Sequence, residues 1–282
     1  MITATSIDQI RRVITAWKKD TRTICLVPTM GFFHDGHVAL MKHGQQRADK
    51  VVVSLFVNPA QFGPAEDLDS YPQNLQTDMQ VAEEAGVDVL FHPAKAEIYT
   101  NDHQTTVCVA ELSKGLCGKD RPQHFPGVAT VVSKLFNIVE PDMAVFGKKD
   151  YQQLAVIKKM VADLNFNVEI IGHEIVREAD GLAMSSRNAY LDKHERRDAA
   201  ILFKALTMVK QQVDMSPAYL ESQPLLREAE TFIIKNSNCT VDYLAIIDSS
   251  NLEPKSQVIG ECRIAGAIRI NNKVRLIDNM AL

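Results

Sequence analysis

Two histidines and two glycines, placed close together, are the first residues of this sequence that could do chemistry. His34 and His37 lie three positions apart, and Gly31 and Gly36 accompany them. Glycine lets the backbone approach a ligand closely or adopt a positive φ angle. A helix that begins here would direct its first amide groups and its dipole at an anion, which both imidazoles could face. The H-x-G-H spacing therefore predicts a phosphate site that supplies protons or positive charge to a reacting phosphoryl group.

An apolar run and a helical pattern frame this turn. Ile24–Val27 precedes it and Val38–Met41 follows it, which predicts a strand, a glycine-bearing turn and a helix start. The same residues would suit an ordinary surface turn, but this frame is the one that a nucleotide site needs. The residues that we expect at a bound nucleotide here are Met30, Gly31, His34, Gly36 and His37.

A second group comprises Gly147, Lys148, Lys149 and Asp150. Lysine here could neutralise phosphate oxygens, and the aspartate could accept hydrogen bonds from ribose hydroxyls. Gln153 follows about one helical turn later, so its amide could point into the same cleft. Such a run is also typical of a solvated helix start, so on its own it indicates little.

A third group, Met184 to Arg187, lies within the polar stretch Asp180–Asn188. Its two hydroxyls, on Ser185 and Ser186, and its guanidinium suit a mobile loop that grips phosphates by charge-assisted hydrogen bonds. A polar connection with one surface arginine would have the same composition.

Two neutral amides, Asn58 and Gln61, lie on either side of Pro59 and Ala60. Their donors and acceptors suit a hydroxy acid or an amine as substrate. Ordinary turn chemistry beside a proline is the alternative interpretation.

The elements that must position these groups alternate between strands and helices. Strands are predicted at Ile24–Val27, Val51–Val57, Val87–Phe91, Thr105–Val109, Asp142–Phe146 and Asn167–Ile171, and helices at Ser6–Lys18, Val38–Ala48, Tyr71–Ala85, Val128–Val139 and Tyr151–Asp163. This alternation predicts an α/β fold, a Rossmann-like parallel sheet with helices on both faces. Ligands of such sheets lie at the carboxyl ends of the strands. The H-x-G-H turn, the Gly147–Asp150 group and the Asn58–Gln61 pair all fall there.

The pattern changes after Arg187. Helices are predicted at Asp192–Val213 and Pro217–Lys235, and strands at Val241–Ile247, Cys262–Ile268 and Val274–Ile277. These elements predict a smaller α+β domain. We expect a nucleotide- and substrate-binding domain at residues 1–178 and the small domain at residues 179–282.

Composition excludes several classes of protein. The 282 residues carry a net charge of −4, with 46% apolar and 23% charged residues, as in an ordinary soluble protein. We expect no nucleic-acid or membrane partner, because the charge is not basic and no run of 18 apolar residues occurs. The first residues lack the pattern of a signal peptide, so we expect a cytoplasmic protein.

The cysteines and the other histidines indicate no metal site. The five cysteines form no C-x-x-C pair, and the remaining histidines lack zinc-ligand spacing. Cys25 and Cys108 fall in predicted strands, so we expect both to be small buried apolar residues.

Five motifs, taken in order, resemble the pantoate–β-alanine ligase family over essentially the whole chain. They are PTMGxxHxGH at 28–37, FVNPxQF at 56–62, RPxHFxGV at 121–128, GxKDxQQ at 147–153 and DGLAMSSRN at 180–188. The resemblance implies an H-x-G-H nucleotidyltransferase site on a Rossmann-like domain, with the small C-terminal domain acting as a lid. Members often have glutamate at Lys148 and glycine at Gln123, so the local charge and the presentation of the 121–128 motif differ here.

The resemblance also implies roles for individual residues. His37 would donate a proton, and His34 would contact the phosphates beside it. Gln61 would bind pantoate and face β-alanine, Gln153 would bind pantoate, and Asn58 belongs to the same substrate site. The other residues expected at ATP are Met30, Gly31, Gly36, Gly147, Lys148, Lys149, Asp150, Val176 through its backbone, Met184, Ser185, Ser186 and Arg187. Lys149 and Arg187 are the cations placed to meet the β- and γ-phosphates.

The implied reaction has two steps. The carboxylate of pantoate attacks the α-phosphorus of ATP, which gives pantoyl adenylate and pyrophosphate. The amine of β-alanine then attacks the acyl carbon, which gives pantothenate and AMP. Mg²⁺ is expected because triphosphate chemistry commonly needs it, although the sequence does not identify its ligands. The family also implies a homodimer.

Two other classes fit part of the pattern. One is a different H-x-G-H nucleotidyltransferase, such as a class I aminoacyl-tRNA synthetase or a phosphopantetheine adenylyltransferase. The Ser185–Arg187 stretch, in place of a lysine-rich loop, disfavours a synthetase. The other class is a nucleotide-binding module without catalytic activity.

Overall fold

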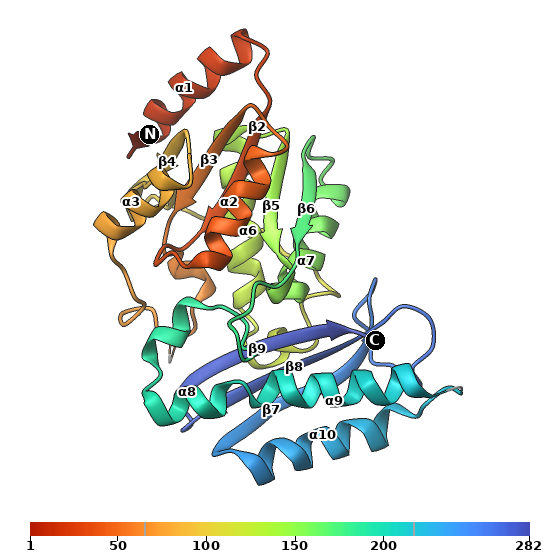
Figure 1. Ribbon diagram of the computed structural model, residues 1–282. Helices are drawn as coiled ribbons and strands as arrows, with labels where there is room; N and C mark the ends of the chain where they lie inside the picture. Colours follow the sequence, from red (N-terminus) through yellow and green to blue (C-terminus); the bar gives the residue numbers. More distant parts are fainter. Residues whose placement is uncertain (65, 217) are drawn as a thin grey trace. The chain divides into compact units, whose positions relative to one another are not determined.

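The computed structural model describes residues 1–64, 66–216 and 218–282. Its contacts divide the chain into two compact units (Figure 1). The first unit comprises Met1–Lys114, Gly118–Lys148 and Gln153–Glu174, and the second comprises Gly115–Cys117, Lys149–Gln152 and Ile175–Leu282. Two short inner segments of the chain therefore belong with its C-terminal part. The limits expected from sequence, 1–178 and 179–282, stay a prediction.

The first unit is built on a six-stranded sheet with the strand order β1-β4-β3-β2-β5-β6, in which every pair is parallel. The strands are β1 (Ile2–Ala4), β2 (Ile24–Thr29), β3 (Lys50–Leu55), β4 (Val89–Phe91), β5 (Met143–Gly147) and β6 (Glu169–His173). The predicted parallel sheet is confirmed. The strand β1 was not predicted, because three residues are too few to show a period.

Helices cover both faces of this sheet, as predicted. Ile24 and Leu26 of β2 pack into one apolar cluster with α1, α6 and α7, while Cys25 and Val27 pack into another with α2 and α3. All four side chains are fully buried, as expected for a parallel strand with a helix layer on each side. The helices of this part of the chain are α1 (Ile7–Lys19), α2 (Asp35–Gln45), α3 (Leu75–Glu84), α4 (Lys95–Ile98), α5 (Cys117–Asp120), α6 (His124–Val139) and α7 (Tyr151–Asp163).

The predicted strand at Thr105–Val109 is wrong. The segment forms no ladder with the other described residues. The amide of Val107 instead donates to the Thr130 hydroxyl at 2.9 Å. Cys108 is exposed, so its predicted burial is wrong as well, whereas Cys25 is buried as predicted. Burial raises the pKa of the Cys25 thiol to about 12.

The second unit contains a three-stranded antiparallel sheet with the order β7-β8-β9. Its elements are α8 (Lys193–Ala199), α9 (Ile201–Met215), α10 (Ser222–Asn236), β7 (Cys239–Asp248), β8 (Cys262–Ile270) and β9 (Val274–Ala281). Apolar side chains of the strands, such as Ile264, Ile268 and Leu276, pack with α9 and α10 in one cluster. Figure 1 shows α9 and α10 running along this sheet. The prediction of a smaller α+β part is therefore confirmed.

Two helix predictions in this unit need correction or comment. The single helix expected at Asp192–Val213 is two helices, α8 and α9, which meet at Ala200. Asp192 caps α8 by accepting from the amides of His194 and Glu195. The predicted start of the next helix, Pro217, lies outside the described residues. None of the described helices is long and apolar enough to cross a membrane.

Candidate active site

The histidine turn joins β2 to α2 through two residues with positive φ angles. Gly31 has φ +86°, and Phe32 has φ 54°. A Cβ atom at position 31 would lie 2.9 Å from a carboxylate oxygen of Asp78 and 3.1 Å from the Leu55 side chain. Glycine is therefore required at position 31 both by conformation and by space.

A buried aspartate on α3 holds this turn. The carboxylate of Asp78, which is 1% exposed, accepts hydrogen bonds from the amides of Phe32 at 2.8 Å and Phe33 at 2.7 Å. Sequence reasoning missed this residue. The available signal was an acidic side chain on the inward face of α3, next to Ala82, where an apolar residue is expected.

The two histidines cap α2 and lie together, as the sequence predicts. His34 Nδ1 accepts from the Gly36 amide at 3.1 Å, and His37 Nδ1 accepts from the His34 amide at 3.3 Å. The ring centroids are 4.1 Å apart. Because Nδ1 accepts in each ring, a neutral imidazole here carries its proton on Nε2. Both rings can thus donate a hydrogen bond to an anion at the start of α2.

Gln61 lies next to this turn at the end of β3, in the 3₁₀ helix η1 (Pro59–Gln61). Its Nε2 atom is 3.0 Å from Met30 Sδ, and its Oε1 atom accepts from Asn58 Nδ2 at 3.1 Å. The loops that follow β2 and β3 therefore bring Met30 and Gln61 together. This juxtaposition agrees with the rule that ligands of parallel sheets lie at the carboxyl ends of the strands.

Asn58 is buried, and its amide is fully engaged. The nitrogen donates to Gln61 and to the Gly127 carbonyl at 3.1 Å, while the oxygen accepts from the Ala60 amide and the Tyr99 hydroxyl at 2.9 Å. Burial raises the pKa of Tyr99 to about 12, so its hydroxyl stays a donor at neutral pH. Sequence reasoning did not identify Tyr99, because nothing near it in sequence indicates this contact.

The motif at 121–128 supports Gln61 from its other side. The carbonyl of Gln61 contacts Arg121 at 3.4 Å and His124 Nδ1 at 2.9 Å. Arg121 also pairs with Glu66. Burial raises the pKa of Glu66, but hydrogen bonds and the charge of Arg121 outweigh it and leave the pKa below its ordinary value. Arg121 and His124 thus keep a defined place despite glutamine at position 123.

The lysine group is divided between the two units. Gly147 ends β5, and Lys148 pairs with Glu174 within the first unit. Lys149 and Asp150 belong to the second unit, with the ammonium 3.6 Å from the carboxylate. Gln153 returns to the first unit on α7.

The segment around Arg187 forms a hairpin and a 3₁₀ helix, η3 (Ser186–Tyr190). The Met184 amide donates to the Val176 carbonyl at 3.0 Å, and the backbones of Arg177 and Ala183 form an isolated antiparallel β-bridge. The Ser185 hydroxyl then accepts from the Arg187 amide at 3.3 Å. The polar stretch expected from sequence is therefore a folded structure in which Val176 and Met184 lie side by side.

Each unit thus gathers its own share of the predicted residues. The first unit contains Met30, Gly31, His34, Gly36, His37, Asn58, Gln61, Gly147, Lys148 and Gln153, and the second contains Lys149, Asp150, Val176, Met184, Ser185, Ser186 and Arg187. Among the described residues, no three His, Cys, Asp or Glu side chains are placed to hold a metal ion.

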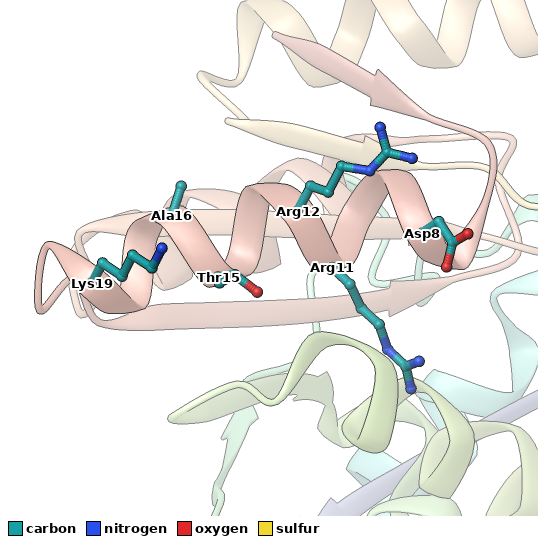
Figure 2. A pocket seen from close by; sticks show the side chains of 6 residues that line it. All are labelled: Asp8, Arg11, Arg12, Thr15, Ala16 and Lys19. Atoms are coloured by element: carbon teal, nitrogen blue, oxygen red, sulfur yellow. The ribbon is translucent and has the colours of Figure 1, made fainter.

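A shallow hollow of about 470 Å³ lies elsewhere, along α1 (Figure 2). The side chains that line it all come from this one helix, namely Asp8, Arg11, Arg12, Thr15, Ala16 and Lys19. None of the predicted site residues is among them. We regard it as the solvated face of α1.

A comparison with protein-family models decides the family. Residues 2–281 match the model for pantoate–β-alanine ligase. The chain belongs to the pantoate–β-alanine ligase family. The predicted resemblance is therefore confirmed over nearly the whole chain.

Curated relatives and solved structures agree with this family. A pantothenate synthetase of Caldicellulosiruptor bescii is 45% identical over 282 residues, which cover 100% of this chain and 99% of the relative. A pantothenate synthetase structure from Thermus thermophilus has a TM-score of 0.93 at 40% identity, and 99% of each chain is covered. The pantoate–β-alanine ligase of Francisella tularensis, solved with β,γ-ATP and β-alanine, has a TM-score of 0.82 at 34% identity, covering 100% of this chain and 97% of that one.

Membership of the pantoate–β-alanine ligase family establishes the reaction class. The protein is an ATP-dependent ligase that forms pantothenate from pantoate and β-alanine. The alternatives of another H-x-G-H nucleotidyltransferase and of a module without activity are thereby set aside.

Proposed function

We propose that this ligase works through pantoyl adenylate, with the histidine turn as the site of adenylation. The observation that carries the proposal is the pair of imidazoles at the start of α2, whose Nδ1 atoms both accept from backbone amides. Each neutral ring then carries its donor on Nε2. His37 donates to the phosphate that gains charge, and His34 contacts the phosphates beside it.

The remaining ATP contacts that we propose are those that the family resemblance implies. In the first unit, Met30 and Gly31 offer backbone to the nucleotide, and Gly36, which has no side chain, lets the nucleotide approach the start of α2. Gly147 and Lys148 extend the site from the end of β5. In the second unit, Asp150 accepts from ribose, the backbone of Val176 contacts adenine, and Met184, Ser185 and Ser186 bind phosphates. Lys149 and Arg187 neutralise the β- and γ-phosphates as pyrophosphate departs.

The substrates bind through neutral amides. Gln61 and Gln153 bind pantoate, and Gln61 also faces β-alanine. Asn58, whose four hydrogen-bonding positions are occupied within the protein, acts on the substrate site by orienting Gln61. No side-chain nucleophile is required, because pantoate attacks ATP and β-alanine attacks the adenylate. Catalysis then comes from positioning and charge stabilisation.

Mg²⁺ fits this scheme as a companion of ATP. Because the described residues contain no cluster of three potential ligands, the ion would be held chiefly by phosphate oxygens and water, as is usual for triphosphates. It would neutralise phosphate charge. We also propose a homodimer, which the family resemblance implies, and a cytoplasmic location, with which five free cysteines agree.

A substrate-omission experiment tests the adenylate. Pyrophosphate release should require ATP and pantoate but not β-alanine, whereas AMP and pantothenate should appear only when β-alanine is added. Pyrophosphate release that depends on β-alanine would show a concerted reaction instead, and the two-step proposal would be abandoned.

A further inference from the structure

Two adjacent residues of β9, Asp278 and Asn279, connect the two parts of the second unit that carry its ATP-site residues. Both side chains are buried, with exposures of 5% and 3%. Successive side chains of a strand point to opposite faces of the sheet. Each of the two residues therefore reaches a different segment of the chain.

Asn279 holds the backbone of Lys149. Its Nδ2 atom donates to the Lys149 carbonyl at 2.9 Å, while its Oδ1 atom accepts from Arg263 at 2.6 Å. The guanidinium of Arg263 in turn lies 4.0 Å above the ring of Tyr151, two residues after Lys149. The Tyr151 hydroxyl donates to the Ser249 carbonyl at 2.8 Å. The short turn that bears Lys149 is thus held at the Lys149 carbonyl and, just after the turn, at Tyr151.

Asp278 holds the hairpin that precedes Arg187. Its carboxylate accepts both ends of the Arg177 guanidinium, at 2.6 and 2.9 Å. Arg177 also donates to the Gly181 carbonyl and stacks on Phe203 of α9 at 4.5 Å. A bidentate pair of this kind fixes direction as well as distance. Burial raises the pKa of Asp278, and the charges of Arg177 and Lys149 oppose that rise.

We propose that Asp278 and Asn279 are positioning residues for adenylation, Asn279 acting through Lys149 and Asp278 through the Val176–Arg187 segment. The inference rests on the proposed function of those partners. The strand β9 thereby positions both Lys149 and the Val176–Arg187 segment. A displacement of about 1 Å in such a group is enough to slow a reaction severely.

A double-mutant cycle tests the part played by Asn279. Asn279→Asp keeps the acceptor for Arg263 and removes the donor to Lys149, and Asn279→Ala removes both. We expect each to slow single-turnover pyrophosphate release about tenfold. Conversion of synthetic pantoyl adenylate should change less than about twofold. In a Lys149→Ala background the same substitutions should add less than about twofold, because residues that act together are not additive.

The controls separate this role from simple destabilisation. Ile233→Val loosens the core of the same unit on α10, where the side chain is fully buried, and should leave both half-reactions near wild type. Equal slowing of both steps, or the same added slowing with and without Lys149, would overturn the inference. If the single variant Lys149→Ala leaves the rate of adenylation unchanged, then the proposed role of Lys149 fails. This result does not depend on the Asn279 variants, so the two failures can be distinguished.

A second arm tests Asp278. Asp278→Asn keeps the shape of the side chain but removes the ion pair with Arg177. We expect the KM for ATP to rise about tenfold, with little change in the KM for pantoate. An unchanged KM for ATP, or a rise of the same size in both constants, would overturn the positioning role of Asp278.

Discussion

The histidine turn and the turn that bears Lys149 are anchored in opposite ways. His34 and His37 are held by partners two or three residues away, with help from Asp78. The carbonyl of Lys149 is held by Asn279, 130 residues later in the chain. The comparison teaches that one chain can hold one predicted site segment mainly through partners nearby in sequence and another through a strand formed much later in the chain.

The largest effect on the rate of adenylation is expected at Lys149, whose anchor is distant in sequence. Lys149→Ala should slow adenylate formation by roughly 10²–10³-fold, because negative charge grows on pyrophosphate only in that step. Single-turnover kinetics with ATP and pantoate measures it. Lys158→Ala, an exposed lysine of α7, is the control and should behave like wild type.

The second half-reaction sharpens the result. Synthetic pantoyl adenylate should react with β-alanine at a nearly normal rate in Lys149→Ala, since pyrophosphate has already departed. Equal slowing of both steps would place Lys149 at the AMP part of the nucleotide or in the fold. Arg187→Ala should resemble Lys149→Ala and also release more hydrolysed adenylate, if its segment excludes water.

The local part should respond nearly as strongly. His37→Ala removes one stabiliser of the transition state and should slow adenylation by about 10²-fold, as measured by pyrophosphate release. His194→Ala on α8, where the side chain is exposed, provides the comparison. Adenylation by the His37 variant at close to the wild-type rate would remove this residue from the catalytic site.

A smaller effect is expected from the support of the histidine turn. Asp78→Asn replaces one acceptor of the Phe32 and Phe33 amides with a donor, which should lower the free energy of unfolding by about 1–3 kcal/mol. Adenylation should also slow, by about tenfold. Asn74→Ala removes the cap of the same helix at a cost of about 1 kcal/mol and should spare catalysis. If both variants lose activity alike, Asp78 acts on α3 rather than on the turn.

The smallest effect expected is the loss of folding stability in mild acid that His43 causes. The pKa of His43, near the end of α2, is lowered from 6.5 by burial and by the charges of His173 and Arg47. Since folding disfavours the charged ring, the unfolded chain takes up the proton first as the pH falls below 6.5. Stability should therefore decline from pH 7 to pH 5, and His43→Gln should decline less. Urea unfolding at the two pH values measures the difference, and equal slopes would contradict the prediction.

The contrast between local and distant anchoring also explains how far the sequence could be interpreted. The strand, turn and helix around His34 were predictable, because their partners are close neighbours. Asp78, 46 residues from Phe32, was missed despite its place on the inward face of α3, since an acidic residue in a helix normally indicates a solvent-exposed position. Tyr99, 41 residues from Asn58, was also missed, because nothing near it in the sequence indicates their hydrogen bond.

Local composition gave a wrong strand at Thr105–Val109 and did not reveal the break between α8 and α9. Thr105–Val109 has the β-branched character of a strand, yet a strand needs a neighbour, and the described sheet offers it none. No glycine or proline stands between α8, which is polar apart from Ala199, and the amphipathic α9, so nothing in the sequence marked the break at Ala200. The division of two consecutive lysines between two units was equally invisible.

The span between Lys149 and Asn279 has a consequence for how the protein is made. A ribosome adds about 5–20 residues per second, so the anchor of Lys149 is synthesised roughly 6–26 s after Lys149 itself. The histidine turn has all of its described anchors once Asp78 has been added. A growing chain therefore contains every described anchor of the histidine turn well before it contains the residue that holds the carbonyl of Lys149.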